Sequence, residues 1–263
     1  MSLREELEFA WRLAAEVGGV IRDIAASGDL RVERKADDSP VTIADRRAEQ
    51  RLREAIEARF PQDGILGEEY GEKASRNDRR WILDPIDGTK SFVHGVPLCG
   101  TLVALEQSGV AVLGVISIPL LFELAAAAKG EGAFWWPRLE DPTRADSGHR
   151  PARVSSVDRL EAATICLTTP RSMIDPRVAR LAERCLRVRG WGDCYGHLLV
   201  ATGRIEAQLD PAMHVWDNAA VLPLVQEAGG QFSGWDGDPS HLAASAVTTN
   251  GFLHEEVLQY LKE

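Results

Sequence analysis

Hydrophobic positions at helical spacing open the chain. From about Leu3 to Ala26 they recur every three or four residues, with charged residues between them, at Leu7, Trp11, Ala14, Val17 and Ile21. One apolar stripe along an otherwise polar segment is typical of a helix that packs on a core. The pattern therefore predicts a long amphipathic helix that ends near Gly28.

The segment from Gly28 to Val41 is polar and charged, and Pro40 lies near its end. This composition predicts an extended, hairpin-like excursion from the body of the protein. Thr42 then has the position and side chain of a helix N-cap, and Asp45 three residues later completes a capping box. A second helix is therefore predicted from Ile43 to Arg59.

From Trp81 to Leu124 the pattern changes to short apolar runs separated by glycine and proline. Runs of this kind predict strands, here of a mostly antiparallel sheet. The segment 136–153 lacks periodicity and is rich in turn-forming residues, so it is predicted to be a loop. We place the boundary between two subdomains in this loop, with residues 1–140 before it and residues 141–263 after it.

In the second half, strand-like and helix-like segments alternate. A strand, two helices, a strand and a further helix are predicted in turn, at residues 164–169, 176–186, 195–202, 205–210 and 217–228. A final strand and helix follow. This alternation is typical of an α/β layer, in which helices cover a sheet.

Composition places the chain among ordinary globular proteins. Of its 263 residues, 44% are hydrophobic and 27% are charged, so neither disorder nor a fibrous architecture is indicated. No apolar run approaches the roughly 20 residues that span a bilayer, and the opening segment is charged where a secretory signal would be apolar. We therefore expect a cytoplasmic location and no membrane partner. The four cysteines lack metal-ligand spacing, which predicts reduced packing residues.

The formal net charge is −10, which argues against a basic surface for nucleic acid. We expect no nucleic-acid partner. The same charge repels small anions, so a site for a phosphate group would need to invert the local field. Bound divalent cations are the most direct means of doing so.

Two acidic motifs have ordinary alternatives when each is taken alone. Glu68 and Glu69 follow the apolar pair Ile65-Leu66, at a strand end where their charges need not be buried. Adjacent glutamates alone are most often a solvated surface. Asp217 begins an apolar helix, where it would alone be interpreted as the N-cap. Capping and metal binding are compatible, because a helix N-terminus also attracts the anionic group that a metal would bind.

The strongest motif is the segment Asp84-Pro85-Ile86-Asp87-Gly88-Thr89, which directly follows three apolar residues. Pro85 fixes one backbone angle and Gly88 permits a tight turn, so both aspartates can converge on one point. Two carboxylates at the end of a buried strand repel each other, and Mg²⁺, which takes oxygen ligands, would neutralise them. An ordinary turn is the alternative, although a turn would need only one aspartate.

Together, the motifs GEE, WILDPIDGT and WD, in this order and spacing, resemble the inositol monophosphatase superfamily of metal-dependent phosphatases. The resemblance covers nearly the whole chain and includes the segments KADDSPVTIAD, KGEGAFW, GDCYGHLLVATGRIEAQLDP and EAGG. It implies an α/β (α+β) fold, a five-layer αβαβα sandwich with the metal site between the two subdomains. It also implies a homodimer.

The resemblance further implies the ligands of two or three Mg²⁺ ions. Glu68, Asp84 and the backbone carbonyl of Ile86 would hold the first ion. Asp84, Asp87 and Asp217 would hold the second, and a weaker third ion would lie near Glu68. Such cations clamp phosphate oxygens, lower the pKa of a bound water and stabilise an in-line displacement.

Catalytic roles are implied for residues next to these ligands. Thr89 and Asp45 would orient and help to deprotonate a metal-bound water, and Glu69 would support the metal ligands. Gly88 and Thr89 would offer backbone N–H groups to the phosphate. No covalent phosphoenzyme is needed, and the sequence contains neither a phosphate-cradling cysteine loop nor a GxxxxGK[ST] motif.

Lys35 and Asp37 fall in the polar excursion, which in similar proteins folds over the active site. A lid that contributes to the third metal or to the substrate is one interpretation of these residues. A solvated loop is the other.

Substrate choice is expected to depend on Asp193 and Asp210, which match positions that touch the leaving group in relatives. Two carboxylates beside an acidic metal site are costly unless a cation arrives, and an ammonium on the substrate would supply one. The segments DGTKSF, PLCGTLVAL and WGDCYGHLLVATG resemble the histidinol-phosphate phosphatase branch most, whose substrate carries an amine and an imidazole. One of Arg187 and Arg189 is expected to approach the same site, with Arg189 preferred. The alternative is surface charge, which is the more common role of alternating arginines on a strand.

Several alternatives remain open from the sequence. Inositol monophosphate is the next candidate substrate, followed by fructose 1,6-bisphosphate and 3′-phosphoadenosine 5′-phosphate, all small phosphorylated metabolites. A catalytically silent relative that only binds a metabolite or a partner is a different class of protein. Loss of a metal carboxylate or of the pair Thr89 and Asp45 would favour it, and all of these residues are present.

Overall fold

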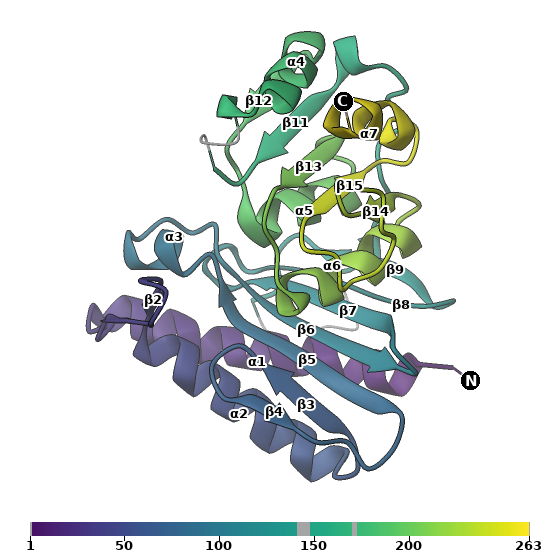
Figure 1. The fold of residues 1–263 in the computed structure, drawn as a ribbon. Coiled ribbons are helices and arrows are strands. Elements are labelled where there is room, and N and C mark those ends of the chain that lie inside the picture. Colours follow the sequence, from purple (N-terminus) through teal and green to yellow (C-terminus); the bar gives the residue numbers. More distant parts are fainter. Residues whose placement is uncertain (1, 141–147, 170–172, 263) are drawn as a thin grey trace.

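The computed structural model describes residues 2–140, 148–169 and 173–262. Figure 1 shows a lower half with the long N-terminal helices and an upper half that ends in the C-terminal helix. The helices are α1 (Arg4–Ser27), α2 (Ile43–Arg59), α3 (Thr89–Val93), α4 (Pro176–Arg184), α5 (Asp193–Ala201), α6 (Val215–Glu227) and α7 (His254–Lys262).

The strands of the first half are β1 (Glu33–Arg34), β2 (Pro40–Val41), β3 (Gly64–Gly67), β4 (Gly71–Lys73), β5 (Arg79–Asp87), β6 (Gly100–Gln107), β7 (Val110–Ile118), β8 (Glu123–Ala128), β9 (Gly132–Trp136) and β10 (Arg150–Pro151). Those of the second half are β11 (Thr164–Leu167), β12 (Arg187–Arg189), β13 (Ala207–Asp210), β14 (Gln231–Ser233) and β15 (Ala246–Thr249). Within the described residues they form sheets of two, eight and five strands.

The predicted N-terminal helices are confirmed. The apolar stripe of α1 is buried against the first sheet and α2, and the helix ends at Gly28, whose φ of 73° is the left-handed conformation that favours glycine. In α2, the Thr42 side chain accepts the backbone N–H of Asp45, whose carboxylate accepts the N–H of Thr42. This reciprocal capping box fixes where the helix begins. Between the two helices, β1 and β2 pair as the predicted hairpin-like excursion.

The first large sheet has the strand order β10-β9-β8-β7-β6-β5-β3-β4. All neighbouring pairs are antiparallel except β3 and β5, which confirms the predicted mostly antiparallel sheet. Because β10 pairs with β9, the sheet extends past residue 140. Residues 141–147 of the predicted loop lie outside the described residues, and the subdomain boundary there stays a prediction.

The second large sheet has the order β12-β11-β13-β15-β14, with parallel pairing among the first three strands. Helices α4 and α7 contact each other, and α7 also contacts this sheet. Helices α5 and α6 lie between the two large sheets, and α6 contacts both. The layers are thus α1 with α2, the first sheet, α5 with α6, the second sheet, and α4 with α7 (Figure 1). The predicted αβαβα sandwich is confirmed.

The middle helix layer lies very close to the first sheet. A Cβ atom added at Gly114 of β7 would lie 2.0 Å from the backbone oxygen of Ala220 in α6. Only glycine permits this approach, so α6 packs directly on the strands that precede it. The start of α6 lies beside the end of β5, where the candidate site is found.

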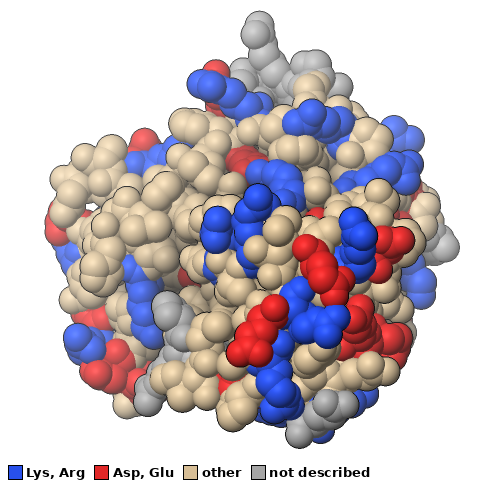
Figure 2. All heavy atoms as spheres, turned by 90° about the horizontal axis from the view of Figure 1, so that it is seen from above, with Lys and Arg blue, Asp and Glu red and all other residues tan. Residues whose placement is uncertain are grey.

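Side chains of both charges are mixed on one face of the molecule (Figure 2). Figure 2 shows the face above α4 and α7, where Lys and Arg side chains lie among Asp and Glu side chains. Among the helices of the described residues, none has the combined length and apolar character that crossing a bilayer requires.

Candidate metal centre and substrate cleft

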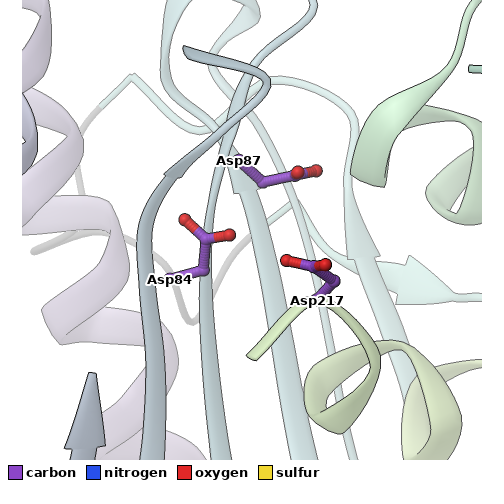
Figure 3. A group of neighbouring side chains, drawn as sticks. All are labelled: Asp84, Asp87 and Asp217. Carbon is purple, nitrogen blue, oxygen red and sulfur yellow. The ribbon is translucent and has the colours of Figure 1, made fainter. Parts of the chain in front are cut away.

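Three aspartates from two distant parts of the chain meet at the interface between the first sheet and α6. Each of Asp84, Asp87 and Asp217 offers a carboxylate oxygen, and these oxygens lie within 4.8 Å of one another. Figure 3 shows the three carboxyl groups around one common space, with Asp84 and Asp87 on β5 and Asp217 on α6. We call these three residues the aspartate cluster.

A regular strand would not bring Asp84 and Asp87 together. Residues three apart point to opposite faces of a sheet. The pairing of β5 with β6 shifts register between the two aspartates, and the Thr101 hydroxyl donates to the Pro85 carbonyl within this irregular stretch at 2.8 Å. The irregularity re-aims one side chain, so both carboxylates face the same space.

Asp217 occupies the third position of α6. Its Oδ2 accepts the backbone N–H of His214 at 2.7 Å, and His214 is the N-cap. The interpretation of Asp217 as the N-cap itself is therefore wrong. The capping box explains the error, because the N-terminal N–H groups of a helix can be satisfied from the third position as well as from the cap.

Glu68 and Glu69 lie beside the cluster. Parallel pairing sets the end of β3 next to β5, and the backbone N–H of Glu68 donates to the Leu83 carbonyl at 3.2 Å. The Lys35 ammonium, from the β1–β2 excursion, donates to Glu68 at 2.7 Å and to Glu69 at 2.5 Å. Partial burial lowers the pKa of Lys35, but these two hydrogen bonds outweigh it, and the net pKa lies above the ordinary lysine value.

Asp45 and Thr89 are in contact across the start of α3. The Thr89 hydroxyl lies 3.3 Å from Asp45 Oδ1 and 2.9 Å from the Ile86 carbonyl oxygen, and it has one proton to donate between them. Asp45 is fully buried, and its other oxygen accepts from Thr42. Burial raises the pKa of Asp45, while the hydrogen bonds from Thr42 oppose the rise.

Two cavities adjoin these residues and share Thr168 and Asp193 in their walls. The larger, about 380 Å³, lies between the β1–β2 excursion, Glu68 and the segment from Gly88 to Ser91. Gly88 has φ 77°, and a Cβ atom there would come within 3.0 Å of an Asp193 carboxylate oxygen. Glycine is therefore required where the backbone of this segment faces the cavity.

The smaller cavity, about 100 Å³, lies on the other side of Asp193. The aspartates Asp87, Asp193, Asp210 and Asp217 all border it. Asp193 has a φ of 53°, an uncommon left-handed conformation for a residue other than glycine, and its N–H donates to Thr168 at 2.8 Å. The two predicted substrate residues, Asp193 and Asp210, therefore line one cavity.

Arg189 lies elsewhere. It belongs to the edge strand β12, it is exposed, and its guanidinium donates to the Val188 carbonyl and stacks over the Trp191 ring. None of these contacts is with a residue of the aspartate cluster or of the smaller cavity. The expectation that Arg189 approaches the site therefore finds no support in its contacts.

The carboxylates of the site destabilise one another. Burial raises the pKa of Asp84 well above its usual range, and the charges of Glu68, Asp87 and Asp217 raise it further. Burial raises the pKa of Asp87 and of Asp217 to about 7 each, again with help from neighbouring carboxylates. Within the described residues, Asp84 Oδ1 is buried without a hydrogen-bond partner. Oxygen ligands without donors are what a hard cation requires, so these residues fit a divalent metal ion.

Comparison with known proteins decides the family. A model described as the inositol monophosphatase family matches residues 2–263. The chain belongs to the inositol monophosphatase family. Among curated relatives of this family member, the histidinol-phosphatase of Chlorobaculum parvum is 46% identical over 229 residues, covering 86% of this chain and 84% of the relative. The histidinol-phosphatase of Mycobacterium tuberculosis is 40% identical and covers 98% of both chains.

The fold agrees with that of solved inositol monophosphatases. The IMPase of Thermotoga maritima superposes with a TM-score of 0.85 at 29% identity, covering 98% of this chain and 97% of that one. Like its relatives in the inositol monophosphatase family, the chain is a hydrolase of phosphoric monoesters. The resemblance stated from the motifs is thereby confirmed.

Sequence reasoning missed Glu49 of α2, which holds the turn carrying Glu68 and Glu69. The buried Glu49 carboxylate accepts the backbone N–H of Glu69 at 2.7 Å and that of Tyr70 at 3.2 Å. A Cβ atom at Gly67 would lie 2.0 Å from Glu49 Oε1, so only glycine fits there. The sequence shows only that Glu49 lies on the apolar face of a predicted helix, and this does not identify the groups that it contacts.

Two further contacts at the site were also missed. The backbone N–H of Cys194, in the first turn of α5, donates to Asp87 Oδ2 at 2.5 Å and so orients that carboxylate toward the cluster. His197 of the same helix is buried and lines the smaller cavity. Its position in the predicted helix gave no indication of this, because the cavity forms only when α5 meets β13 and α6.

Proposed function

We propose that this phosphatase is Mg²⁺-dependent and hydrolyses histidinol phosphate. The observation that carries the metal dependence is the aspartate cluster, in which a buried Asp84 oxygen lacks any donor among the described residues and three carboxylates face one another. The observation that supports histidinol phosphate as the substrate is the acidic smaller cavity beside the aspartate cluster. The similarity to two histidinol-phosphatases supports the same substrate.

The residues that would hold the metal are those named from the motifs. Glu68, Asp84 and the Ile86 carbonyl would bind one ion, and Asp84, Asp87 and Asp217 a second, with a weaker third near Glu68. Bound there, the ions supply charge neutralisation of the phosphate and Lewis-acid activation of the attacking water. Because Lys35 occupies an oxygen of Glu68, binding at that carboxylate competes with this ammonium.

The protein's own groups account for proton movement and phosphate binding. Asp45 lies at hydrogen-bond distance from the Thr89 hydroxyl, so a proton taken up by Thr89 can pass to a buried carboxylate with a raised pKa. The backbone N–H groups of Gly88 and Thr89 lie where the chain borders the larger cavity, and donors there would bind the phosphate oxygens. Glu69 is fixed by Lys35 and Glu49 beside these groups.

Part of the leaving group would occupy the smaller cavity, next to Asp193. Burial raises the pKa of Asp193 to about 8, and the charges of Asp87 and Asp210 add to the effect. An ammonium on the substrate would favour the ionised carboxylates and remove this cost. Histidinol phosphate carries such an amine, whereas inositol phosphate and fructose 1,6-bisphosphate do not.

The test is a comparison of kcat/KM for four phosphate esters at saturating Mg²⁺. Histidinol phosphate is expected to be hydrolysed at least about tenfold more efficiently than inositol 1-phosphate, fructose 1,6-bisphosphate or 3′-phosphoadenosine 5′-phosphate, a difference of roughly 1.4 kcal/mol. Turnover of inositol phosphate at the same or a higher efficiency would contradict the substrate. Full activity after removal of divalent ions would contradict the metal dependence.

A further inference from the structure

The wall of the smaller cavity contains a buried polar group that the proposed function leaves unused. His197 of α5 is 1% exposed and borders the cavity together with Asp210. Its Nδ1 lies 2.8 Å from the Thr248 hydroxyl oxygen. Its Nε2 lies 3.1 Å from Asp210 Oδ2, but within the described residues this nitrogen makes no hydrogen bond of acceptable geometry.

The surroundings of His197 decide which ring nitrogen carries the proton. A bare Nε2 would place a lone pair 3.1 Å from a carboxylate oxygen in a buried site, with no donor between the two acceptors. With the proton on Nε2, the Thr248 hydroxyl can donate to Nδ1, and the nitrogen next to Asp210 becomes a donor. His197 therefore presents an N–H at the cavity wall.

Asp210 is fixed by a different donor. The Gln208 amide donates to Asp210 Oδ2 at 2.7 Å and to the Thr168 hydroxyl at 3.1 Å. Gln208 itself cannot shift toward α5, because a Cβ atom at Gly196 would already lie 2.0 Å from its Oε1. The carboxylate is thus held out of line with the His197 N–H, and the wall offers a donor and an acceptor side by side.

We propose that His197 determines the specificity of this site by donating its Nε2–H to a ring nitrogen of the leaving group. A neutral imidazole has one acceptor nitrogen, which can accept the His197 N–H. The cavity of about 100 Å³ holds roughly three times the liquid volume of one water, which is room for a small ring but not for a whole substrate. The inference rests on the proposed function, since it assigns the imidazole of histidinol phosphate to this cavity.

A pair of substrates isolates this hydrogen bond. Phenylalaninol phosphate keeps the amine and the phosphate of histidinol phosphate but has no ring nitrogen. The measured quantity is the ratio of kcat/KM between the two esters. In the wild-type enzyme we expect a ratio of at least about tenfold, because a site that binds a polar ring leaves its own groups unpaired with phenyl.

Two variants then test His197 itself. His197→Phe removes the donor, and the ratio is expected to fall toward one, mainly through a higher KM for histidinol phosphate. His197→Gln keeps an N–H near the position of Nε2, and the ratio is expected to stay well above that of the Phe variant. Calorimetric binding of histidinol and phenylalaninol, the two dephosphorylated products, should show the same order without any turnover.

Two results would overturn the inference. If His197 has only a structural role, the Phe variant should have a lower kcat/KM for both esters in the same proportion. The ratio between the two esters would then stay unchanged. A wild-type ratio near one would be decisive without any variant, even if the variants fail to fold. Failure of the proposed function would be recognised differently, by faster wild-type turnover of inositol phosphate. In that case too, the ratio of kcat/KM between histidinol phosphate and phenylalaninol phosphate tests the role of His197.

Discussion

Asp63 and Asp84 are both buried aspartates of the N-terminal half, yet their carboxylates have opposite surroundings. Asp63, at the end of the turn before β3, accepts hydrogen bonds from Asn77 at 2.8 Å, Arg79 at 3.1 Å and the Trp81 indole at 3.0 Å. Three donors, one of them cationic, replace the water that the carboxylate lost on burial. Asp63 therefore needs nothing from outside the chain.

Asp84, on β5, has the opposite surroundings. Its nearest charged neighbours are the carboxylates of Glu68, Asp87 and Asp217, and its Oδ1 has no donor in the part of the chain that the structure describes. A buried carboxylate with matched donors stabilises the fold, whereas one among other carboxylates destabilises it until a cation arrives. The difference distinguishes a structural aspartate from a candidate metal ligand without reference to any relative.

The same substitution at the two positions should therefore have opposite effects. Asp84→Asn removes one negative ligand from the cluster and is expected to lower kcat/KM by at least about a thousandfold, or roughly 4 kcal/mol. In metal-free buffer it should unfold at the same or a higher temperature than the wild type, because a like-charge repulsion is gone. Activity within tenfold of the wild type would show that Asp84 is no metal ligand.

Asp63→Asn is the matched control on the structural side. It takes the charged acceptor from Arg79 Nε and from the Trp81 indole, while Arg79 keeps its ion pair with Glu6, so we expect a loss of about 2 kcal/mol in the free energy of unfolding. At temperatures well below unfolding, kcat/KM should change by less than about threefold, because the hydrogen-bond partners of the Asp63 carboxylate are Asn77, Arg79 and Trp81 and none of these is a site residue. Denaturant titration measures the first effect, and unchanged stability would remove the distinction between the two aspartates.

Thr89 tests the contact next to the cluster. Thr89→Ala deletes the hydroxyl that lies 3.3 Å from Asp45, and kcat is expected to fall by about a hundredfold. Thr89→Ser restores the hydroxyl and should recover most of the rate. Equal losses in the two variants would mean that the methyl group, and not the proton path, is what matters at this position.

The pH dependence of stability sharpens the comparison further. Burial raises the pKa of Asp87 and Asp217 to about 7 in the metal-free protein, above the ordinary value of 3.8. A raised carboxyl pKa contributes stability that is present below about pH 4 and is lost as the pH rises through about 7.

The metal-free protein is therefore expected to become less resistant to denaturant from pH 5 to pH 8. Saturating Mg²⁺ should remove most of this decline, and Asp217→Asn should reduce it. A decline of the same size in the presence of Mg²⁺ would mean that it arises from groups outside the cluster.

The positions of several helices and strands could be predicted from the sequence because they depend on residues that are close together in the chain. The capping box of Thr42 and Asp45 involves residues three apart, so the start of α2 follows from the sequence alone. The apolar periodicity of α1 is equally local, and so are the glycine and proline residues that separate the strands of the first sheet. The αβαβα order followed only from the resemblance carried by the acidic motifs.

The rest depends on contacts between distant segments. The motif predicted that Asp84 and Asp87 converge, but it did not reveal the means, which is a shift in register of β5 against β6. Glu49 acts through backbone groups twenty residues away, and nothing in its helix marks it. His197 borders a cavity that is lined by residues of β5, α5, β13 and α6. In each case the sequence gives the type of residue, but its contacts are known only from the folded structure.

Calorimetric titration of the metal-free protein with MgCl₂, at pH 8 and in parallel with Asp84→Asn, tests the central claim most directly. We predict saturable binding by the wild type, with at least one ion per chain, and a loss of most of that binding in the variant. Equal binding by both proteins, or no binding by either, would contradict the claim that these carboxylates converge to hold a divalent cation.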